Sequence, residues 1–252
     1  MISKSDIKYF SSLNQKKYRK KENRFLAEGL KIVLEGIKSQ YECEVILVTY
    51  EFADKQSDVI KYLKKENLAI ELINFHDFQK ISDTKTPQGI IGVFKYEALN
   101  FSINKNHSNL LVYLDNISDP GNLGTIIRTC HWFDIKEILI SPNSSEFLNP
   151  KVVRASMGSI FHLKIYDDIE INVLKEIKSS GYKIICSDLR GENIFNFKFP
   201  ERFVITLSSE SAGPSEEIIS LADKSVTIPK FGNAESLNVS VAAGIILSRI
   251  KS

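Results

Sequence analysis

The stretch from residue 228 to residue 240 combines polar side chains with a predicted change of secondary structure. It reads Ile-Pro-Lys-Phe-Gly-Asn-Ala-Glu-Ser-Leu-Asn-Val-Ser. Pro229 cannot donate a hydrogen bond to a sheet, so the apolar run before it is predicted to be a strand that ends there. Ser236 is a good N-cap residue and predicts a helix from about residue 237. A strand end, a loop and a helix start form a common ligand-binding corner of α/β sheets, although a capped helix alone fits the same residues.

Two earlier stretches have the same organisation. Residues 114–129 run from an apolar strand through an Asp-Pro-Gly turn into a predicted helix, with Asn122 near its start and Arg128 nearly two turns further on. These two side chains are predicted to approach the same side of the helix, although an N-cap Asn and a surface Arg would give the same pattern. Residues 203–214 run from a second apolar strand into a loop of small residues, which lets a backbone approach a ligand closely. Glu210 is the one charge in that loop, and an acid favoured by a helix N-terminus is the simpler interpretation of it.

Parallel strands end at the same edge of a sheet, where α/β proteins bind their ligands. The three loops are therefore predicted to converge and to bring together Asn122, Arg128, Glu210, Ser236 and Asn238. Ser236 is the only typical nucleophile of the five and no His accompanies it, which excludes a hydrolase triad. The chain has no G-x-G-x-x-G run, so a nucleotide-binding oxidoreductase lacks its fingerprint.

Composition limits the class of protein further. The 252 residues are 43% hydrophobic and 25% charged, as in soluble globular proteins of one or two domains. No apolar run reaches the length of a membrane span and the first residues contain no apolar signal region, so a cytoplasmic protein is expected. The three Cys and four His residues have no metal-ligand spacing, and no metal site is expected.

Basic residues are concentrated near the N-terminus. Residues 1–24 contain eight Lys or Arg residues against two acids, while the whole chain carries a net charge of only +2. Tyr and Phe residues are interleaved with them, a combination that suits RNA phosphates and stacked bases. A solvated charge run at a mobile terminus fits this stretch as well. The candidate RNA contacts are Lys16, Lys17, Arg19, Lys20, Lys21 and Arg24.

The remaining pattern alternates between strand and helix. Residues 1–97 predict a small α/β domain with a helix over residues 5–12, a basic turn after it and one helical apolar face from Phe25 to Ile37. The polar residues 98–109 are the predicted linker. From residue 110 to residue 252, a βα repeat with almost wholly apolar strands predicts a parallel sheet that is covered on both faces.

The three polar stretches resemble, in order, the three motifs of the SpoU family of RNA ribose 2′-O-methyltransferases, which are TrmH-like members of the SPOUT superfamily. They read N-x-G-x-x-x-R over 122–128, S-x-E-x-x-G over 208–213 and I-P-x-x-G-x-x-x-S-L-N-V-S over 228–240. The first hundred residues resemble the RNA-binding extension of that family, a ribosomal-protein (L30e-like) fold. The chain departs from the family where Ser208 and Ser211 replace the usual Gly, and where Lys230 replaces an apolar residue.

The resemblance implies a parallel-sheet domain with a C-terminal trefoil knot, a homodimer through that domain, and S-adenosyl-L-methionine as cofactor. It implies methylation of a ribose 2′-hydroxyl in structured RNA, with rRNA (23S) favoured over tRNA, and leaves a non-catalytic RNA-binding relative as the alternative. We expect Arg128 to bind a phosphate and polarise the hydroxyl, because Arg does not deprotonate in proteins. The implied catalytic residues are Asn122, Arg128, Glu210, Ser236 and Asn238. The implied cofactor-binding residues are Ser208, Gly213, Ile228, Leu237 and Asn238.

Overall fold

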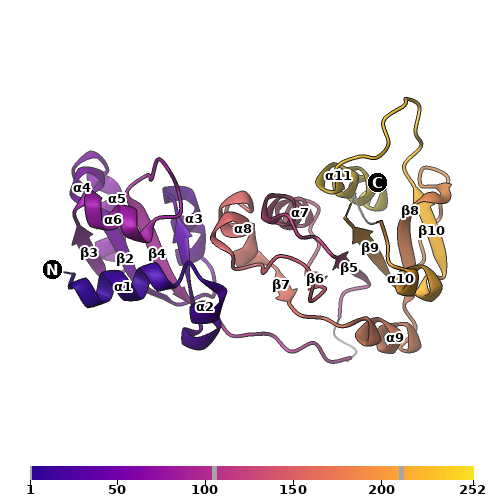
Figure 1. Cartoon of the computed structure of the whole chain (residues 1–252), viewed down its shortest axis with the longest axis horizontal. Helices are drawn as coiled ribbons and strands as arrows, with labels where there is room; N and C mark the ends of the chain where they lie inside the picture. The colour runs from indigo at the N-terminus through magenta and orange to yellow at the C-terminus, as the bar shows by residue number, and fades with distance from the viewer. Residues whose placement is uncertain (1, 104–106, 210–212) are drawn as a thin grey trace. The chain divides into compact units, whose positions relative to one another are not determined.

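The computed structural model describes residues 2–103, 107–209 and 213–252, and the chain divides into two compact units (Figure 1). Unit 1 contains Met1–Glu97 together with Leu148–Phe161, and unit 2 contains Ala98–Phe147 together with His162–Ser252. The segment Leu148–Phe161 lies in the second half of the sequence, yet it packs with the N-terminal residues. No helix in the described part of the chain is long and apolar enough to cross a membrane.

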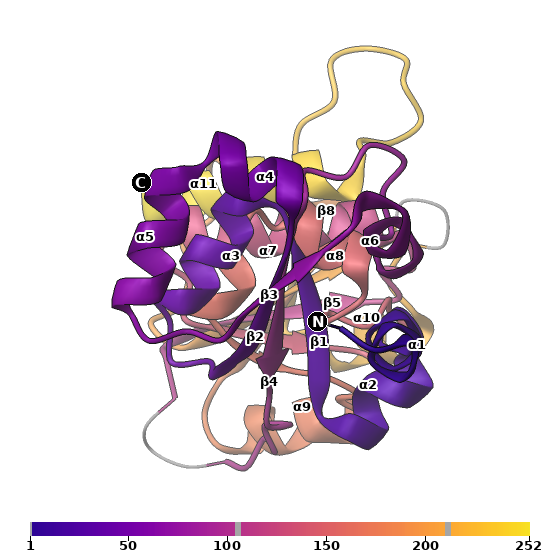
Figure 2. The ribbon, with the colours of Figure 1, turned by 90° about the vertical axis from the view of Figure 1, so that its left-hand side faces the viewer.

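Unit 1 is built on a four-stranded sheet whose order is β1-β4-β2-β3 (Figure 2). The strands are β1 (Arg24–Glu28), β2 (Cys43–Thr49), β3 (Ile70–Ile73) and β4 (Ile90–Lys95). β4 is antiparallel to both of its neighbours, whereas β2 and β3 are parallel. The sheet is therefore mixed. The parallel strands β2 and β3 are joined by the helices between them, as a parallel pair requires.

Helices cover both faces of this sheet. Successive strand residues point to opposite faces, so Leu47 belongs to one core cluster and Ile46 and Val48 to another. The first cluster includes residues of α1 and α6, and the second includes residues of α3, α4 and α5. The helices of unit 1 are α1 (Lys4–Ser12), α2 (Lys16–Glu22), α3 (Leu30–Ile37), α4 (Tyr50–Lys55), α5 (Ser57–Lys65), α6 (Phe75–Ile81) and α8 (Pro150–Ala155), with a 3-10 turn at Ser159–His162.

Two predictions for unit 1 are wrong. The basic turn after the first helix is the helix α2, and the helical face expected from Phe25 onward is strand β1 followed by helix α3. Gly29 separates the two elements with a φ of 105°, a conformation that favours glycine. The spacing from residue 30 to residue 37 is helical, but Phe25 to Glu28 are buried consecutively, as in a strand covered on both faces.

Unit 2 contains a six-stranded sheet in which every recorded pairing is parallel, in the order β10-β8-β9-β5-β6-β7 (Figure 1). This confirms the predicted parallel sheet. Helices α9 and α10 pack on one face, and α11 contacts both α7 and β9. The elements are β5 (Leu110–Asp115), α7 (Pro120–Trp132), β6 (Glu137–Ile140), β7 (Lys164–Tyr166), α9 (Ile171–Ser179), β8 (Lys183–Asn193), β9 (Phe203–Ser208), α10 (Glu216–Leu221), β10 (Lys224–Thr227) and α11 (Val239–Lys251).

Strand β8 is longer than its apolar run, which predicted residues 183–187 alone. Its pairing with β10 shifts register between Ser225 and Val226 and then continues to Asn193. Gly191 makes this continuation possible, because a Cβ there would lie 2.5 Å from backbone atoms of Val226. The polar second half of β8 thus lies beside β10, and its residues reach the cavity described next.

Candidate active site

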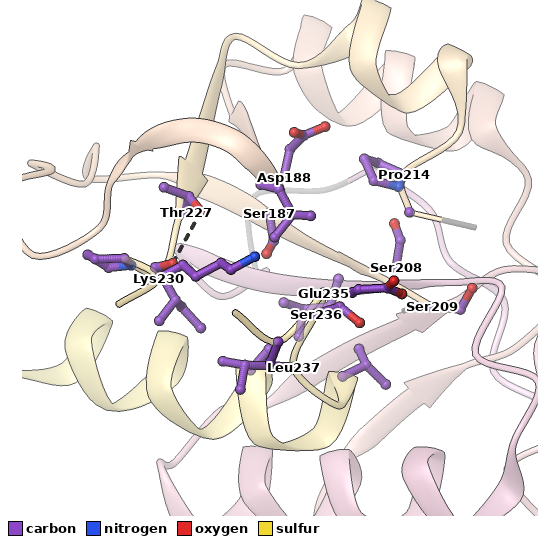
Figure 3. Close-up of a pocket in the computed structure, with 18 of the residues that line it drawn as sticks. Ser187, Asp188, Ser208, Ser209, Pro214, Thr227, Lys230, Glu235, Ser236 and Leu237 are labelled. Carbon is purple, nitrogen blue, oxygen red and sulfur yellow. Dashed lines mark hydrogen bonds between the residues drawn. The ribbon is translucent and has the colours of Figure 1, made fainter. Parts of the chain in front are cut away.

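A cavity of about 300 Å³ lies in unit 2, beside the middle of β8 and where β9 and β10 pass into the loops that follow them (Figure 3). The segment between β10 and α11 supplies almost half of its lining, and most of the lining side chains are apolar or small. Its lining residues are Ser187, Asp188, Leu189, Leu207, Ser208, Ser209, Gly213, Pro214, Thr227, Ile228, Pro229, Lys230, Phe231, Gly232, Ala234, Glu235, Ser236, Leu237, Val239 and Ala242.

The structure brings most of the predicted cofactor residues together at this cavity. Ser208, Gly213, Ile228 and Leu237 all line it, and so does Ser236 from the catalytic set. Asn238, Asn122 and Arg128 are not among its lining residues. Glu210, together with the family position at Ser211, lies outside the described residues.

Asn238 connects the cavity segment to helix α7. Its Oδ1 accepts a hydrogen bond from the backbone N–H of Ser240 at 3.0 Å, which makes Asn238 the N-cap of α11. Its Nδ2 donates to Asn122 Oδ1, also at 3.0 Å. The prediction that Ser236 caps this helix is therefore wrong, because the residue that caps it is the one that also reaches α7.

Asn122 is available for this contact because another residue caps α7. The Asp119 carboxylate accepts from the backbone N–H of Asn122 at 2.8 Å, and Pro120 occupies the first turn of the helix. The simpler interpretation of Asn122 as an N-cap is thus excluded. The side-chain amide of Asn122 instead joins the first motif to the third.

Arg128 lies on α7 with its side chain exposed to solvent. Within the described ranges, no hydrogen bond or ion pair to its guanidinium group is recorded. A guanidinium without an internal partner has all five N–H donors available for an external anion. This fits a contact with substrate better than a structural role.

Ser208 is held by a buried carboxylate at the end of β5. Its Oγ donates to Asp115 Oδ2 at 3.3 Å, and Asn116 Nδ2 donates to the other oxygen at 3.0 Å. Asp115 is only 5% exposed, and burial raises its pKa above the ordinary value against the effect of these hydrogen bonds. Sequence reasoning did not select Asp115, although an acid that ends an apolar strand beside a motif is a recognisable signal.

The basic segment of unit 1 divides into two groups. Lys16, Lys17, Lys20 and Lys21 are exposed, as an RNA contact requires. Arg19 is only 2% exposed and donates from Nη1 to the carbonyl oxygen of Leu13 at 2.8 Å, so its selection as an RNA contact is wrong. Arg24 forms an ion pair with Glu44 and donates to the Glu22 carbonyl oxygen at 2.6 Å. Both arginines thus bond to groups of the protein itself.

A parallel sheet with an apolar cavity at the carboxyl ends of its strands is the arrangement of α/β proteins that bind nucleoside-like ligands. Residues 109–248 match the model of the SpoU rRNA Methylase family, and residues 4–92 match the MRM3-like substrate binding domain. The chain belongs to the SpoU rRNA methylase family. It is an RNA ribose 2′-O-methyltransferase, and its cofactor is S-adenosyl-L-methionine.

Three similar proteins illustrate this relationship. The chain is 28% identical over 249 residues to the 23S rRNA (guanosine(2553)-2′-O)-methyltransferase RlmP of Bacillus subtilis, covering 97% of this chain and 95% of that protein. It is 32% identical over 150 residues to the tRNA (guanosine(18)-2′-O)-methyltransferase of Aquifex aeolicus, covering 58% of this chain and 70% of that protein. The AdoMet-bound rRNA methyltransferase from Sinorhizobium meliloti superposes with a TM-score of 0.83 at 26% identity, over 99% of this chain and 95% of that one.

The cavity fits a nucleoside cofactor in size and chemistry. Its volume of about 300 Å³ lies at the lower end of the range for small-molecule sites. Leu207, Ile228 and Leu237 offer apolar contact to an adenine ring, and the loops between them offer backbone donors and acceptors. The Ser208 hydroxyl is engaged by Asp115, so the serine that replaces a family Gly has a partner within the protein.

Proposed function

We propose that this enzyme methylates a ribose 2′-hydroxyl in structured rRNA, 23S rRNA rather than tRNA, in the cytoplasm. The observation that carries this proposal is the convergence of the second and third motifs on one cavity, with the Asn122–Asn238 hydrogen bond beside it. Coverage supports the choice of RNA: the similarity to the 23S rRNA enzyme spans both units, whereas the similarity to the tRNA enzyme spans 58% of the chain.

The cofactor occupies the cavity in this proposal. Ser208, Gly213, Ile228 and Leu237 hold it mainly through backbone groups, and Asn238 fixes the segment to which Leu237 belongs. When bound, S-adenosylmethionine supplies an electrophilic methyl group that the ribose 2′-oxygen accepts as it loses its proton. Holding the two reactants together supplies up to roughly 7–11 kcal/mol of the barrier reduction.

Arg128 binds the RNA beside the cavity. Its planar guanidinium donates two parallel hydrogen bonds to a phosphate, and this places its positive charge near the 2′-hydroxyl. The charge stabilises the developing alkoxide, and Arg128 itself stays protonated. Asn122, Ser236 and Asn238 position the ribose and the loop, and Glu210 orients Arg128 or the loop amides.

Unit 1 holds the rest of the RNA. Helix α2 presents Lys16, Lys17, Lys20 and Lys21 to solvent, and such a row of ammonium groups neutralises successive phosphates. The match of residues 4–92 to a substrate binding domain supports the same role. The ribosomal-protein (L30e-like) fold is the form we propose for this unit.

The path of the C-terminal segment supports the proposed trefoil knot. β10 is an edge strand that pairs with β8. The chain that leaves β10 nevertheless forms α11, which contacts β9, the strand beyond β8, and also contacts helix α7. A crystal structure traced through residues 185–240 tests whether the segment passes through the preceding loop.

The same two helices carry the surface that we propose for a homodimer. Trp132 at the end of α7 is 84% exposed and Val241 near the start of α11 is 51% exposed. A second copy of the chain would cover both. Light scattering after size-exclusion chromatography should give a dimer for the wild type and a monomer for Trp132→Lys.

The function is tested by ribose-methylation mapping. Bulk rRNA and tRNA from a strain that lacks the gene should be incubated with the purified enzyme and S-adenosylmethionine, then digested and analysed by mass spectrometry. We expect one new 2′-O-methylnucleotide in 23S rRNA and none in tRNA. Methylation of tRNA alone would overturn the choice of substrate, and methylation of neither would overturn the proposed activity on these RNAs.

A further inference from the structure

The cavity contains a single basic side chain among its described lining residues, that of Lys230. Figure 3 shows this side chain extending toward Ser187, across the side of the cavity that β8 forms. The other charged groups in the lining are the carboxylates of Asp188 and Glu235. A cavity built mainly of apolar and small residues thus carries one ammonium group at a defined side.

The Lys230 side chain has no recorded hydrogen-bond or ion-pair partner among the described residues. Among the described residues, no acidic oxygen lies within 4.0 Å of its Nζ, and no hydrogen bond to it is recorded. Asp188, which also lines the cavity, has a different partner. Its Oδ2 forms an ion pair with Arg190 Nη2 at 3.2 Å, and its Oδ1 accepts a hydrogen bond from the backbone N–H of Arg190 at 2.7 Å. The ammonium of Lys230 therefore has its donors available for a ligand in the cavity.

The cofactor of this enzyme carries one anionic group, the carboxylate of its methionine portion, beside a cationic sulfonium and an ammonium group. An unpaired Lys in the cavity attracts the carboxylate and repels the two cations, so it determines which end of the ligand faces it. We propose that the Lys230 ammonium binds the methionine carboxylate of S-adenosylmethionine and thereby orients the cofactor. This inference rests on the proposed placement of the cofactor in this cavity.

The expected contribution is modest, because the segment from Lys230 to Leu237 is exposed. A charge-assisted hydrogen bond in a partly open site changes affinity by about five- to tenfold, and salt screens it. Lys230 acts as a specificity-determining residue for ligands that carry the carboxylate. It has no role in the binding of the adenosine portion.

Calorimetric titration tests this with two ligands that differ in a single group. One is S-adenosylhomocysteine and the other is its decarboxylated analogue, which keeps the ammonium group and the thioether. Each is titrated into the wild type, Lys230→Met, Lys230→Arg and the control Lys224→Met. Lys224 is an exposed lysine at the start of β10, outside the cavity lining.

We expect Lys230→Met to weaken S-adenosylhomocysteine binding about five- to tenfold and to change the affinity of the decarboxylated analogue less than twofold. Lys230→Arg should retain most of the affinity, Lys224→Met should behave as wild type, and the difference between ligands should shrink at high salt. Equal effects of Lys230→Met on both ligands, or no effect on either, would overturn the inference. Failure of both ligands to bind wild type would instead overturn the placement of the cofactor, and the role of Lys230 with it.

Discussion

Asn238 Nδ2 donates a hydrogen bond to Asn122 Oδ1 at 3.0 Å, although 116 residues separate the two in the chain. The same Asn238 side chain caps α11 through Ser240, so one amide both starts the last helix and fastens it to α7. The first and third motifs are thus joined by their own polar side chains. This explains why an Asn, with one donor and one acceptor group, serves at position 238.

Asn238→Ser separates the two functions of this side chain. Serine keeps an N-cap oxygen, so stability should change by less than about 1 kcal/mol, but its side chain is too short to reach Asn122. We expect kcat/KM for RNA methylation to fall at least tenfold, since the loop loses its contact with α7. A methylation assay on Asn238→Ser, Asn122→Ala and the double variant measures this. Additive losses would show that the two residues act independently.

Arg128→Lys tests the bidentate role of the guanidinium. Lysine keeps the charge but presents a point charge in place of a planar pair of donors, so kcat/KM should fall by about tenfold or more while cofactor affinity is unchanged. Steady-state kinetics with RNA as the varied substrate, beside calorimetry with S-adenosylmethionine, provide both values. Full activity in Arg128→Lys would contradict the proposed contact.

Ser208 replaces a family Gly, and its hydrogen bond to Asp115 predicts how it should respond to substitution. Ser208→Gly should leave cofactor affinity within about threefold of wild type, because the hydroxyl is already turned to a protein partner. Ser208→Val cannot form that bond and leaves the buried Asp115 with one partner fewer, so it should lower both stability and affinity. Thermal unfolding with and without S-adenosylmethionine measures these effects, and a large gain of affinity in Ser208→Gly would show that the serine obstructs the site.

The strands of unit 2 could be predicted because their sequences are apolar runs of strand length, which indicates strands buried on both faces. Leu110 to Leu114 and Glu137 to Ile140 are runs of strand length with few polar residues, which a sheet covered on both faces requires. Phe25 to Glu28 could not be assigned in this way, because four buried residues beside a helical pattern fit either element. There the pairing of β1 with the distant strand β4 decides the structure.

The sequence motifs predicted which loops form the site. They did not predict which side chains from distant parts of the chain bond to each other. Ser236 and Asn238 are both good N-cap residues, and only the contact with Asn122 on another helix selects Asn238. Lys230 stood out only as a departure from the resembled motif, and Asp115 was not selected although it ends an apolar strand, since a lone charge in a loop or at a strand end has many uses. Arg19 was misassigned because a basic run gives no indication of which residue faces inward once α2 forms.

Arg19 and its lysine neighbours should therefore behave differently on substitution. Arg19→Met removes a buried donor and leaves the Leu13 carbonyl oxygen without that bond, so we expect a loss of roughly 1–3 kcal/mol in the free energy of unfolding. Replacing Lys16, Lys17, Lys20 and Lys21 by Gln should leave stability nearly unchanged and weaken RNA binding, with a reduced dependence on salt. Urea denaturation and RNA titrations at two salt concentrations separate the two groups. Unchanged RNA affinity in the lysine variant would exclude α2 from the RNA surface.

A buried contact between a Glu and a His side chain at the start of β6 should make the stability of unit 2 depend on pH. Glu137 Oε1 lies 2.9 Å from His107 Nδ1, and Oε2 accepts from the backbone N–H of Ser108 at 2.7 Å. His107 Nε2 lies 2.8 Å from the Ser102 carbonyl oxygen, so both ring nitrogens face oxygen atoms of the protein. Desolvation alone would raise the pKa of Glu137, but the bonds from Ser108 and His107 outweigh it and lower that pKa below its usual value.

A carboxyl group with a lowered pKa in the folded state stabilises the protein above its unfolded-state pKa, and this contribution is lost as the pH falls through the folded-state value. Glu137→Gln should therefore cost about 2–4 kcal/mol at pH 7, and the difference from wild type should shrink between about pH 5 and pH 3. Urea denaturation across this range measures it, with Glu176→Gln on the exposed face of α9 as the control. A Glu137→Gln cost that stays constant down to pH 3 would show that packing, and not the ionised Glu137 carboxylate, stabilises this end of the sheet.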